Sequence, residues 1–287
     1  MSTRPGQALA RLALAPSVAV LATWSTVPLA LAIYYAFLRY RLDDPDNTSF
    51  AGWSNFYYFI TDPFFAKDIF NTVALVFLVI GISIIGGVLL AMLLNRPFWG
   101  RGIVRVMVIS PFFIMPTVSA LVWKNLMMHP VYGLFAHLWQ SVGLEPLDWF
   151  ARIPLTSVAL IVAWQWLPFA ALILLTSLQS LDEEQMDAAS MDGAGALDRF
   201  RYILLPHLAR PITVVILIET IFLLNVFAEI KVTSVGGLAG NLTYLVFSQL
   251  NDANNIGEAA AGGLIAVVVA NIVSAFLVRL IGRNLET

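Results

Sequence analysis

The chain has 287 residues; 12% of them are charged, against about 25% in a soluble globular domain, and 59% are hydrophobic. Its formal net charge of −2 argues against a surface that binds nucleic acid or another polyanion. The lack of cysteine excludes disulfides, thiolate metal sites and cysteine nucleophiles. Most of the chain is therefore expected to lie in lipid or against other apolar helices.

Six apolar segments are long enough to cross a bilayer, since a spanning helix needs about 20 mostly apolar residues. Only the fifth segment contains charged residues, Glu219 and Glu229. A secretory signal is the alternative for the first segment, but its apolar run exceeds the roughly 7–15 residues of a signal core. We therefore expect an all-α membrane protein with six transmembrane helices. The expected spans are residues 12–38, 69–95, 106–123, 153–181, 211–230 and 259–278.

The distribution of lysine and arginine predicts the orientation of these spans, because cytoplasmic loops carry an excess of positive residues. With the N-terminus inside, ten of the sixteen lysines and arginines fall on the inner side and six on the outer side. Both termini are thus expected in the cytoplasm, with the polar loop 182–210 on the same side. We divide the chain into residues 1–64, with the first helix and an outer loop, and a core domain at residues 65–287.

Polar residues at membrane depth are rare and usually face the interior of the bundle or a cavity. If the fifth span is one helix, Glu219, Asn225 and Glu229 share a face with Phe222 and Val226. Carboxylates and amides can bind hydroxyl groups, and aromatic faces can cover the C–H faces of a sugar or polyol. A purely structural role in helix packing is the alternative. The candidate solute path is Phe222, Asn225, Val226 and Glu229, with Trp164 and Gln165 of the fourth span.

The loop between the fourth and fifth spans has signals of two short helices. Asp182 can cap a helix start, and acidic residues follow in the first turn, where they offset the helix dipole. Gly193 can take the left-handed conformation that ends a helix. A second short helix is expected from Ala194, and Pro206 and Pro211 mark the return to the membrane. An amphipathic hairpin on the membrane surface is the alternative interpretation.

Residues 187–206 of this loop read DAASMDGAGALDRFRYILLP. They resemble the cytoplasmic loop with which the permease subunit of a binding-protein-dependent ABC importer contacts its ATPase. The family pattern is Glu-Ala-Ala, three residues, Gly, nine residues and Ile-x-Leu-Pro, and this chain has Asp in place of Glu. The candidate coupling residues are Asp187, Ala188, Ala189, Asp192, Gly193, Ile203, Leu205 and Pro206.

The resemblance implies a type I ABC importer permease fold and a set of partners. These are two ATP-binding subunits, a homologous permease that makes a heterodimer, and a periplasmic solute-binding protein. It also implies a location in the bacterial inner membrane. The chain has no phosphate-binding loop of the Walker A pattern, so ATP and Mg²⁺ would be used by the partner ATPase. No catalytic residue, bound cofactor or metal site is expected in this chain, and three scattered histidines (His129, His137, His207) do not form a metal site.

A second resemblance, to the carbohydrate branch of these permeases, follows the fifth span. Residues 233–237 read TSVGG, similar to the Thr-x-Gly-Gly-Pro run of the maltose, glycerol-phosphate and polyol systems, although Leu238 replaces the proline. This resemblance implies import of a sugar or a sugar alcohol such as mannitol or sorbitol. An ABC permease for another solute and a self-contained secondary transporter are the alternatives. The secondary transporter would need internal inverted repeats and ion-coupling carboxylates. A membrane-embedded enzyme would need clustered His, Asp or Glu, which the sequence lacks.

Overall fold

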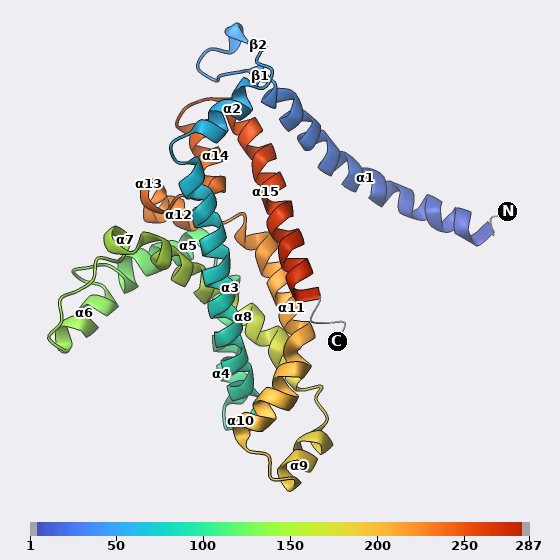
Figure 1. The fold of residues 1–287 in the computed structure, drawn as a ribbon, viewed down its shortest axis with the longest axis vertical. Coiled ribbons are helices and arrows are strands. Elements are labelled where there is room, and N and C mark those ends of the chain that lie inside the picture. Colours follow the sequence, from blue (N-terminus) through green and yellow to red (C-terminus); the bar gives the residue numbers. More distant parts are fainter. Residues whose placement is uncertain (1–4, 283–287) are drawn as a thin grey trace. The chain divides into compact units, whose positions relative to one another are not determined.

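The computed structural model describes residues 5–282, and most of them are helical (Figure 1). The described chain forms two compact units, which we treat separately. The small unit contains the residues up to 65 together with Leu245–Val268. The large unit contains Ala66–Tyr244 and the residues after 268. The predicted division at residue 64 placed Leu245–Val268 in the core domain, whereas here this segment groups with the N-terminal part.

The small unit joins a long helix to a short hairpin. It contains α1 (Pro5–Ala36), β1 (Leu38–Arg39), a 3₁₀ turn (Pro45–Asn47), β2 (Ser49–Phe50), α2 (Ser54–Thr61), most of α14 (Leu242–Asn251) and the first half of α15 (Ile256–Gly282). The strands are antiparallel, with Leu38 opposite Phe50. Buried Asn55 fixes their position, because its amide donates to the carbonyl oxygens of Ala36 and Leu38, both at 2.8 Å.

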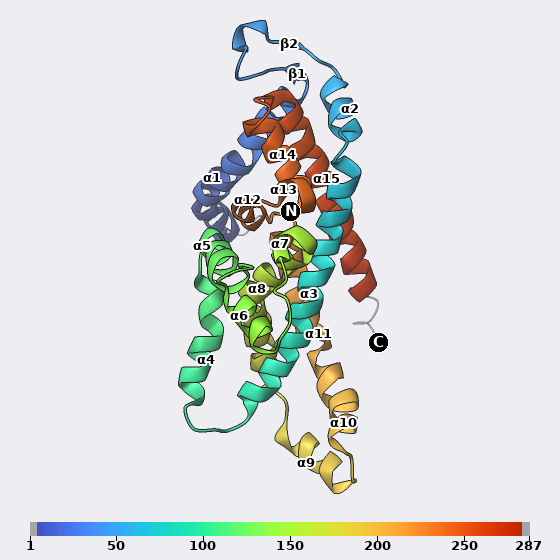
Figure 2. The same ribbon diagram turned by 90° about the vertical axis from the view of Figure 1, so that its left-hand side faces the viewer.

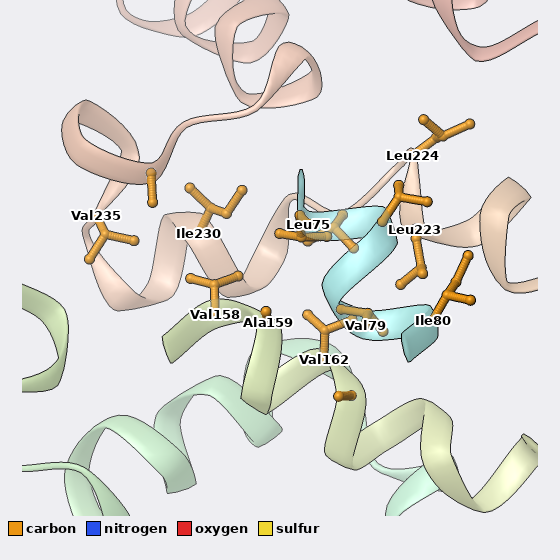
Figure 3. Packing of buried hydrophobic residues seen from close by; sticks show 14 residues of the cluster. Leu75, Val79, Ile80, Val158, Ala159, Val162, Leu223, Leu224, Ile230 and Val235 are labelled. Atoms are coloured by element: carbon orange, nitrogen blue, oxygen red, sulfur yellow. The ribbon is translucent and has the colours of Figure 1, made fainter. Parts of the chain in front are cut away.

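The large unit is built on three long helices, α3 (Phe65–Asn95), α8 (Pro154–Leu178) and α11 (Leu205–Leu223). Around them lie α4 (Arg101–Ile109), η2 (Ser110–Phe113), α5 (Pro116–Val122), η3 (Trp123–Met127), α6 (Leu134–Ser141), α7 (Trp149–Arg152), α9 (Glu183–Met191), α10 (Ala196–Arg199), η4 (Phe200–Leu204), α12 (Ala228–Thr233) and α13 (Gly236–Ala239). Leu75, Val79, Val158, Val162 and Leu223 meet in its core (Figure 3).

Helices α3 and α8 pack closely because glycine faces alanine between them. A Cβ atom at Gly87 would lie 2.9 Å from the Cβ atom of Ala170 and 3.2 Å from the backbone nitrogen of Ala171. Small residues at such contacts let two membrane helices approach, and van der Waals packing then stabilises the pair. The candidate sites are built around these two helices.

Five described helices are long and apolar enough to cross a membrane, and six spans result if one bent pair is counted as a span. This agrees with the predicted number. The span expected at residues 106–123 is not one straight helix, however, because the chain bends by 106° between Arg101–Phe113 and Pro116–Met127. Ile114 and Met115 are extended at the bend. Met115 precedes Pro116, and the residue before a proline avoids the helical conformation.

The prediction of a single fifth helix at residues 211–230 is also wrong. Helix α11 ends at Leu223, and α12 begins only at Ala228. The side chains of Thr243 and Asn241 donate to the carbonyl oxygens of Leu224 and Val226, at 2.9 and 2.6 Å. These carbonyl groups are therefore satisfied without a continuing helix. Glu219, Asn225 and Glu229 consequently do not form the helical stripe that was predicted.

The large unit has two opposite ends, formed by different elements. Helices α9 and α10 and the turn between α3 and α4 lie at one end, and α12 and α13 lie toward the other end (Figures 1 and 2). Helix α11 runs between these ends. A loop that resembles an ATPase contact and the broken part of the fifth span are thus connected by one helix.

Candidate functional site

The loop 182–206 folds as two short helices with a sharp turn between them. Asp182 caps α9, and its carboxylate accepts the backbone N–H of Glu184 at 3.0 Å. Helix α9 ends at Met191, and Gly193 follows with a φ angle of +81°. The predicted cap and the predicted left-handed glycine are both confirmed. Since a side chain is strained at this φ angle, the turn depends on glycine at position 193.

The second helix begins at Ala196, two residues later than predicted, and is tied to the first. The guanidinium group of Arg199 donates to Ser190 Oγ at 2.8 Å, across the turn. The backbone N–H of Gly195 donates to the Asp198 carboxylate at 3.3 Å, which closes the first turn of α10. The α9–α10 hairpin is therefore held in one geometry by its own contacts.

The hairpin and the turn η4 that follows it expose large apolar side chains among charged residues. Met191 is 88% exposed, Leu197 75% and Tyr202 68%. Ala188 is also exposed, and it leaves room on α9 for a neighbouring surface. Large exposed apolar side chains can mark an interaction site, because covering them removes apolar surface from water. The candidate coupling residues Asp187, Ala188, Ala189, Asp192 and Gly193 lie in α9 and its turn.

Pro206 was expected to mark the return to the membrane, but it does not interrupt the helix that leads there. The π turn η4 precedes it, and in that turn the backbone N–H of Leu205 donates to the carbonyl oxygen of Phe200. A π turn shifts the hydrogen-bond pattern by one residue, so the missing N–H of proline is accommodated. Helix from Ala196 to Leu223 therefore forms one 28-residue segment, in which Ile203 and Leu205 lie just before Pro206.

The base of this segment is packed against α8. Leu208 is fully buried in a cluster with Leu174, Leu178 and Val88. His207 Nε2 lies 2.9 Å from the carbonyl oxygen of Ser177, near the end of α8. Movement of the α9–α10 hairpin would consequently be transmitted to α8 and α11 together.

A cavity of about 110 Å³ lies in the large unit where the third span bends. It is lined by Phe112, Ile114, Pro116, Gln165, Trp166 and Glu229. At about 30 Å³ per water molecule, it has room for about four waters. A space of this size receives one edge of a sugar-sized solute rather than the whole molecule.

The bend in the third span positions Gln165 in this cavity. The carbonyl oxygen of Ile114 has no helical partner at the bend, and Gln165 Nε2 donates to it at 2.9 Å. Broken helices are tolerated at membrane depth where side chains or a cavity satisfy the freed backbone groups. Gln165 is buried, with 6% of its surface exposed, and it satisfies this requirement while lining the cavity.

Aromatic rings form the other wall of the cavity. Trp166 packs edge-on against Phe112 with their centroids 5.7 Å apart, and Phe222 of α11 lies 5.0 Å from Trp166. Phe112 also stacks on Phe169 at 5.7 Å. Aromatic faces next to hydrogen-bonding groups fit the alternating C–H and O–H surfaces of a polyhydroxylated solute.

Glu229 reaches the cavity from α12, whose position is fixed by polar contacts. Lys124 Nζ donates to the carbonyl oxygen of Val232 at 3.0 Å and to Ser234 Oγ at 3.3 Å. A cation at this place also interacts favourably with the negative end of the α12 dipole. Glu229 is 5% exposed. The carboxylate is thus held on the cavity wall by a short helix that is anchored at its C-terminal end.

Two glycines explain why the segment after α12 can turn back so tightly. A Cβ atom at Gly236 would overlap the ring of Tyr244, and one at Gly240 would lie 2.5 Å from the carbonyl oxygen of Gly236. Lys67 Nζ donates to the carbonyl oxygen of Gly237 at 2.9 Å, and Asn71 Nδ2 donates to that of Gly240 at 2.8 Å. Gly236, the first residue of the Gly-Gly motif, and Gly240 therefore have a packing role in the turn between α12 and α14.

The structure brings together only part of the predicted solute path. Gln165 and Glu229 line the cavity, and Phe222 packs on its tryptophan wall. Trp164 instead packs edge-on against Trp123, and the amide of Asn225 donates back to the carbonyl oxygen of Ile221. Val226 is buried in the apolar core, so it faces neighbouring helices rather than a solute.

Phe112, Ile114 and Pro116 were not among the predicted site residues. Pro111 and Pro116 were the available signal, because two prolines in an apolar span indicate a break. Glu219 lies outside the cavity lining. It is fully buried in α11, and within the described part of the chain neither carboxylate oxygen has a hydrogen-bond partner.

Comparison with known proteins places these features in context. Residues 83–287 match the model of the family described as binding-protein-dependent transport system inner membrane component. This range contains the α9–α10 hairpin and all cavity residues. The chain is 35% identical to a probable ABC transporter permease protein of Sinorhizobium fredii, over 79% of this chain and 74% of the relative. It is 31% identical to the trehalose/maltose transport system permease protein MalF of Thermococcus litoralis, over 80% and 78%.

The fold is also similar to that of a solved structure. A chain of a bacterial alginate ABC transporter, in complex with an alginate pentasaccharide-bound periplasmic protein, superposes with a TM-score of 0.80. The two chains are 21% identical, and the match covers 97% of this chain and 96% of the other. At this identity the likeness concerns the fold alone, and it agrees with the predicted permease architecture.

Proposed function

Since the chain belongs to the binding-protein-dependent transport system inner membrane component family, we propose that it is a transmembrane subunit of an ATP-driven importer for a sugar or a sugar alcohol such as mannitol or sorbitol. It forms part of the solute path and performs no bond-making chemistry of its own. The observation that carries this proposal is the exposed α9–α10 hairpin, with its matched residues, joined directly to α11.

The sugar class is supported by relatives and by the cavity. Relatives named as trehalose/maltose, trehalose and sn-glycerol-3-phosphate transport permeases match most of this chain. Phe112 and Trp166 offer aromatic faces, and Gln165 and Glu229 offer hydrogen-bonding groups, in a space that fits one edge of a sugar. Sugar alcohols such as mannitol and sorbitol present the same hydroxyl groups on a flexible chain.

The proposed assembly has four further components of three kinds. Two ATP-binding subunits dock on the α9–α10 hairpin and on the corresponding hairpin of a homologous permease, and they use ATP and Mg²⁺. The homologous permease forms a heterodimer with this chain and completes the solute path. A periplasmic binding protein delivers the solute from the other side of the membrane. The exposed apolar residues Met191, Leu197 and Tyr202 support the first of these contacts.

We place the protein in a bacterial inner membrane with both termini in the cytoplasm. The α3–α4 turn and the α9–α10 hairpin lie at the same end of the large unit, as this orientation requires (Figures 1 and 2). Reporter fusions after residues 100 and 195 should be active inside the cell, and fusions after residues 50 and 140 outside. A fusion after residue 195 that is active only outside would reject the proposed ATPase contact.

A direct test expresses the chain with its sister permease, ATPase and binding protein in cells that lack their own sugar uptake. Uptake of labelled trehalose, maltose, mannitol and sorbitol is measured together with copurification of the ATPase. Ala188→Arg places a long cation on the exposed face of α9 and should abolish both. Gln140→Arg, on the exposed surface of α6, is the matched control and should retain both. An Ala188→Arg variant that keeps its ATPase and its uptake would show that the hairpin is not the contact. Entry of disaccharides alone would reject the sugar-alcohol part.

A further inference from the structure

The cavity lining contains an acidic side chain and no basic side chain. Four of the six lining residues are apolar or aromatic, one is an amide and one is a carboxylic acid. No lysine, arginine or histidine lines the cavity. Glu229 is thus the one ionisable side chain described in this lining, and Gln165 and the indole N–H of Trp166 are its other polar groups.

The lining offers a solute both donors and acceptors of hydrogen bonds. One amide hydrogen of Gln165 is donated to the carbonyl oxygen of Ile114, which leaves its second hydrogen and its amide oxygen for a solute, and Trp166 carries an indole N–H. An ionised Glu229 carboxylate is an acceptor only. A hydroxyl group both donates and accepts and can use every one of these groups, whereas a carboxylate, phosphate or sulfonate brings no hydrogen for Glu229. The cavity thus matches hydroxyl groups better than anions, and the difference lies at Glu229.

The two lysines at α12, Lys124 and Lys231, both have partners in the described structure. Lys124 is bound to the carbonyl oxygen of Val232 and to Ser234, at the far end of α12 from Glu229. Lys231, on the same short helix as Glu229, has a partner of its own, and the ion pair between Arg41 and Asp43 lies in the small unit. Glu229 therefore has no salt-bridge partner in the described structure that would cancel its charge.

An anion that leaves water for this space would lose its hydration without gaining a cation. Burial of an unpaired charge is strongly unfavourable, and a like charge within a few ångströms adds repulsion. A neutral solute of the same size pays neither cost, because its hydroxyl groups exchange water for Gln165 and Glu229. The difference acts on the charge of the solute and not on its shape.

We propose that this cavity selects the charge of the transported solute: Glu229, supported by Gln165, admits neutral polyhydroxylated solutes and rejects those with a carboxylate, phosphate or sulfonate group. This inference rests on the proposed function in one respect, because it takes the cavity as part of the solute path. Glu229 is then a specificity-determining residue, and the aromatic wall contributes affinity without regard to charge.

The test measures solute binding to the purified permease pair without the binding protein, which has a specificity of its own. Trp166 lines the cavity, so its fluorescence should change when a solute enters, and Trp166→Phe should remove that signal. Glucose and glucuronate are the probes, since they differ by a hydroxymethyl and a carboxylate group. We expect glucuronate to bind at least tenfold more weakly than glucose. Glu229→Gln should reduce this ratio at least tenfold, while Glu145→Gln, at an exposed loop position, should leave it unchanged.

Three outcomes would overturn the inference. One is equal binding of the two probes to the parental protein, and the second is an unchanged ratio in Glu229→Gln. The third is the absence of any Trp166-dependent signal with either probe, which would remove the cavity from the solute path. The proposed import function is judged separately, by uptake in whole cells. Uptake that persists under any of these outcomes would leave the importer assignment intact and reject only the charge selection.

Discussion

A substitution at Gly193 offers the sharpest test of the α9–α10 hairpin, because it changes only the backbone conformational preference at the turn. Its φ angle is +81°, and a Cβ atom added there would meet nothing within 4 Å. Gly193→Ala therefore introduces no clash and changes only the backbone preference. A non-glycine residue in the left-handed region costs about 1–2 kcal/mol. That cost lowers the population of the docking-ready turn by roughly 5- to 30-fold.

The affinity of the permease for its ATPase should fall by the same factor, since the partner binds only the populated turn. Gly195→Ala is the matched control. Gly195 has a φ angle of −68°, which alanine adopts readily, and its Cβ atom would meet Asp198 at an ordinary 3.4 Å. The assay is a titration of purified ATPase against the permease pair in detergent or nanodiscs. Equal affinities for the two variants would refute the argument that the left-handed turn sets the docking geometry.

Three further predictions concern the broken fifth span. Gly236→Ala should lower the thermal midpoint of the purified protein, because overpacking against Tyr244 costs about 1–3 kcal/mol; Gly237→Ala, with open space around it, should not. If both variants melt alike, the ring contact is unimportant. Lys124→Met should raise the KM of uptake more than it lowers the maximal rate, and Lys124→Arg should restore it, since the cation anchors the helix that carries the cavity carboxylate. A change in maximal rate alone would contradict this role. Glu219→Leu should raise the thermal midpoint, because it removes a buried polar group without a described partner; a lower midpoint would mean that the carboxylate is paired in the assembled transporter.

The sequence predicted the α9–α10 hairpin well because its signals are local. Asp182 as a cap and Gly193 as a left-handed residue each act within a few positions of the chain, and both are found as predicted. The start of the second helix was displaced by two residues, since Gly195 and Asp198 close its first turn. The continuity through Pro206 was missed because a π turn leaves no separate mark in the sequence.

The solute cavity could be predicted only in part because it depends on contacts between distant segments. Gln165 was recognised as a polar residue in an apolar span, but its partner, the carbonyl oxygen of Ile114, lies 51 positions away in the sequence. The prediction that Asn225, Val226 and Glu229 share one helix face assumed an unbroken helix. Side chains from residues 241 and 243 satisfy the carbonyl groups that an unbroken helix would have used.

The two broken spans have a common physical reason, which links them to function. In a membrane interior, a helix can break only where side chains or a cavity satisfy the backbone groups that are released. The side chain of Gln165 donates to the carbonyl oxygen of Ile114 at the first break. The side chain of Asn241 donates to the carbonyl oxygen of Val226 at the second. The first break lies directly in the cavity wall, and the second precedes the short helix that carries Glu229. A polar residue opposite a proline pair in an apolar chain is therefore better interpreted as a cavity wall than as a general contact between helices.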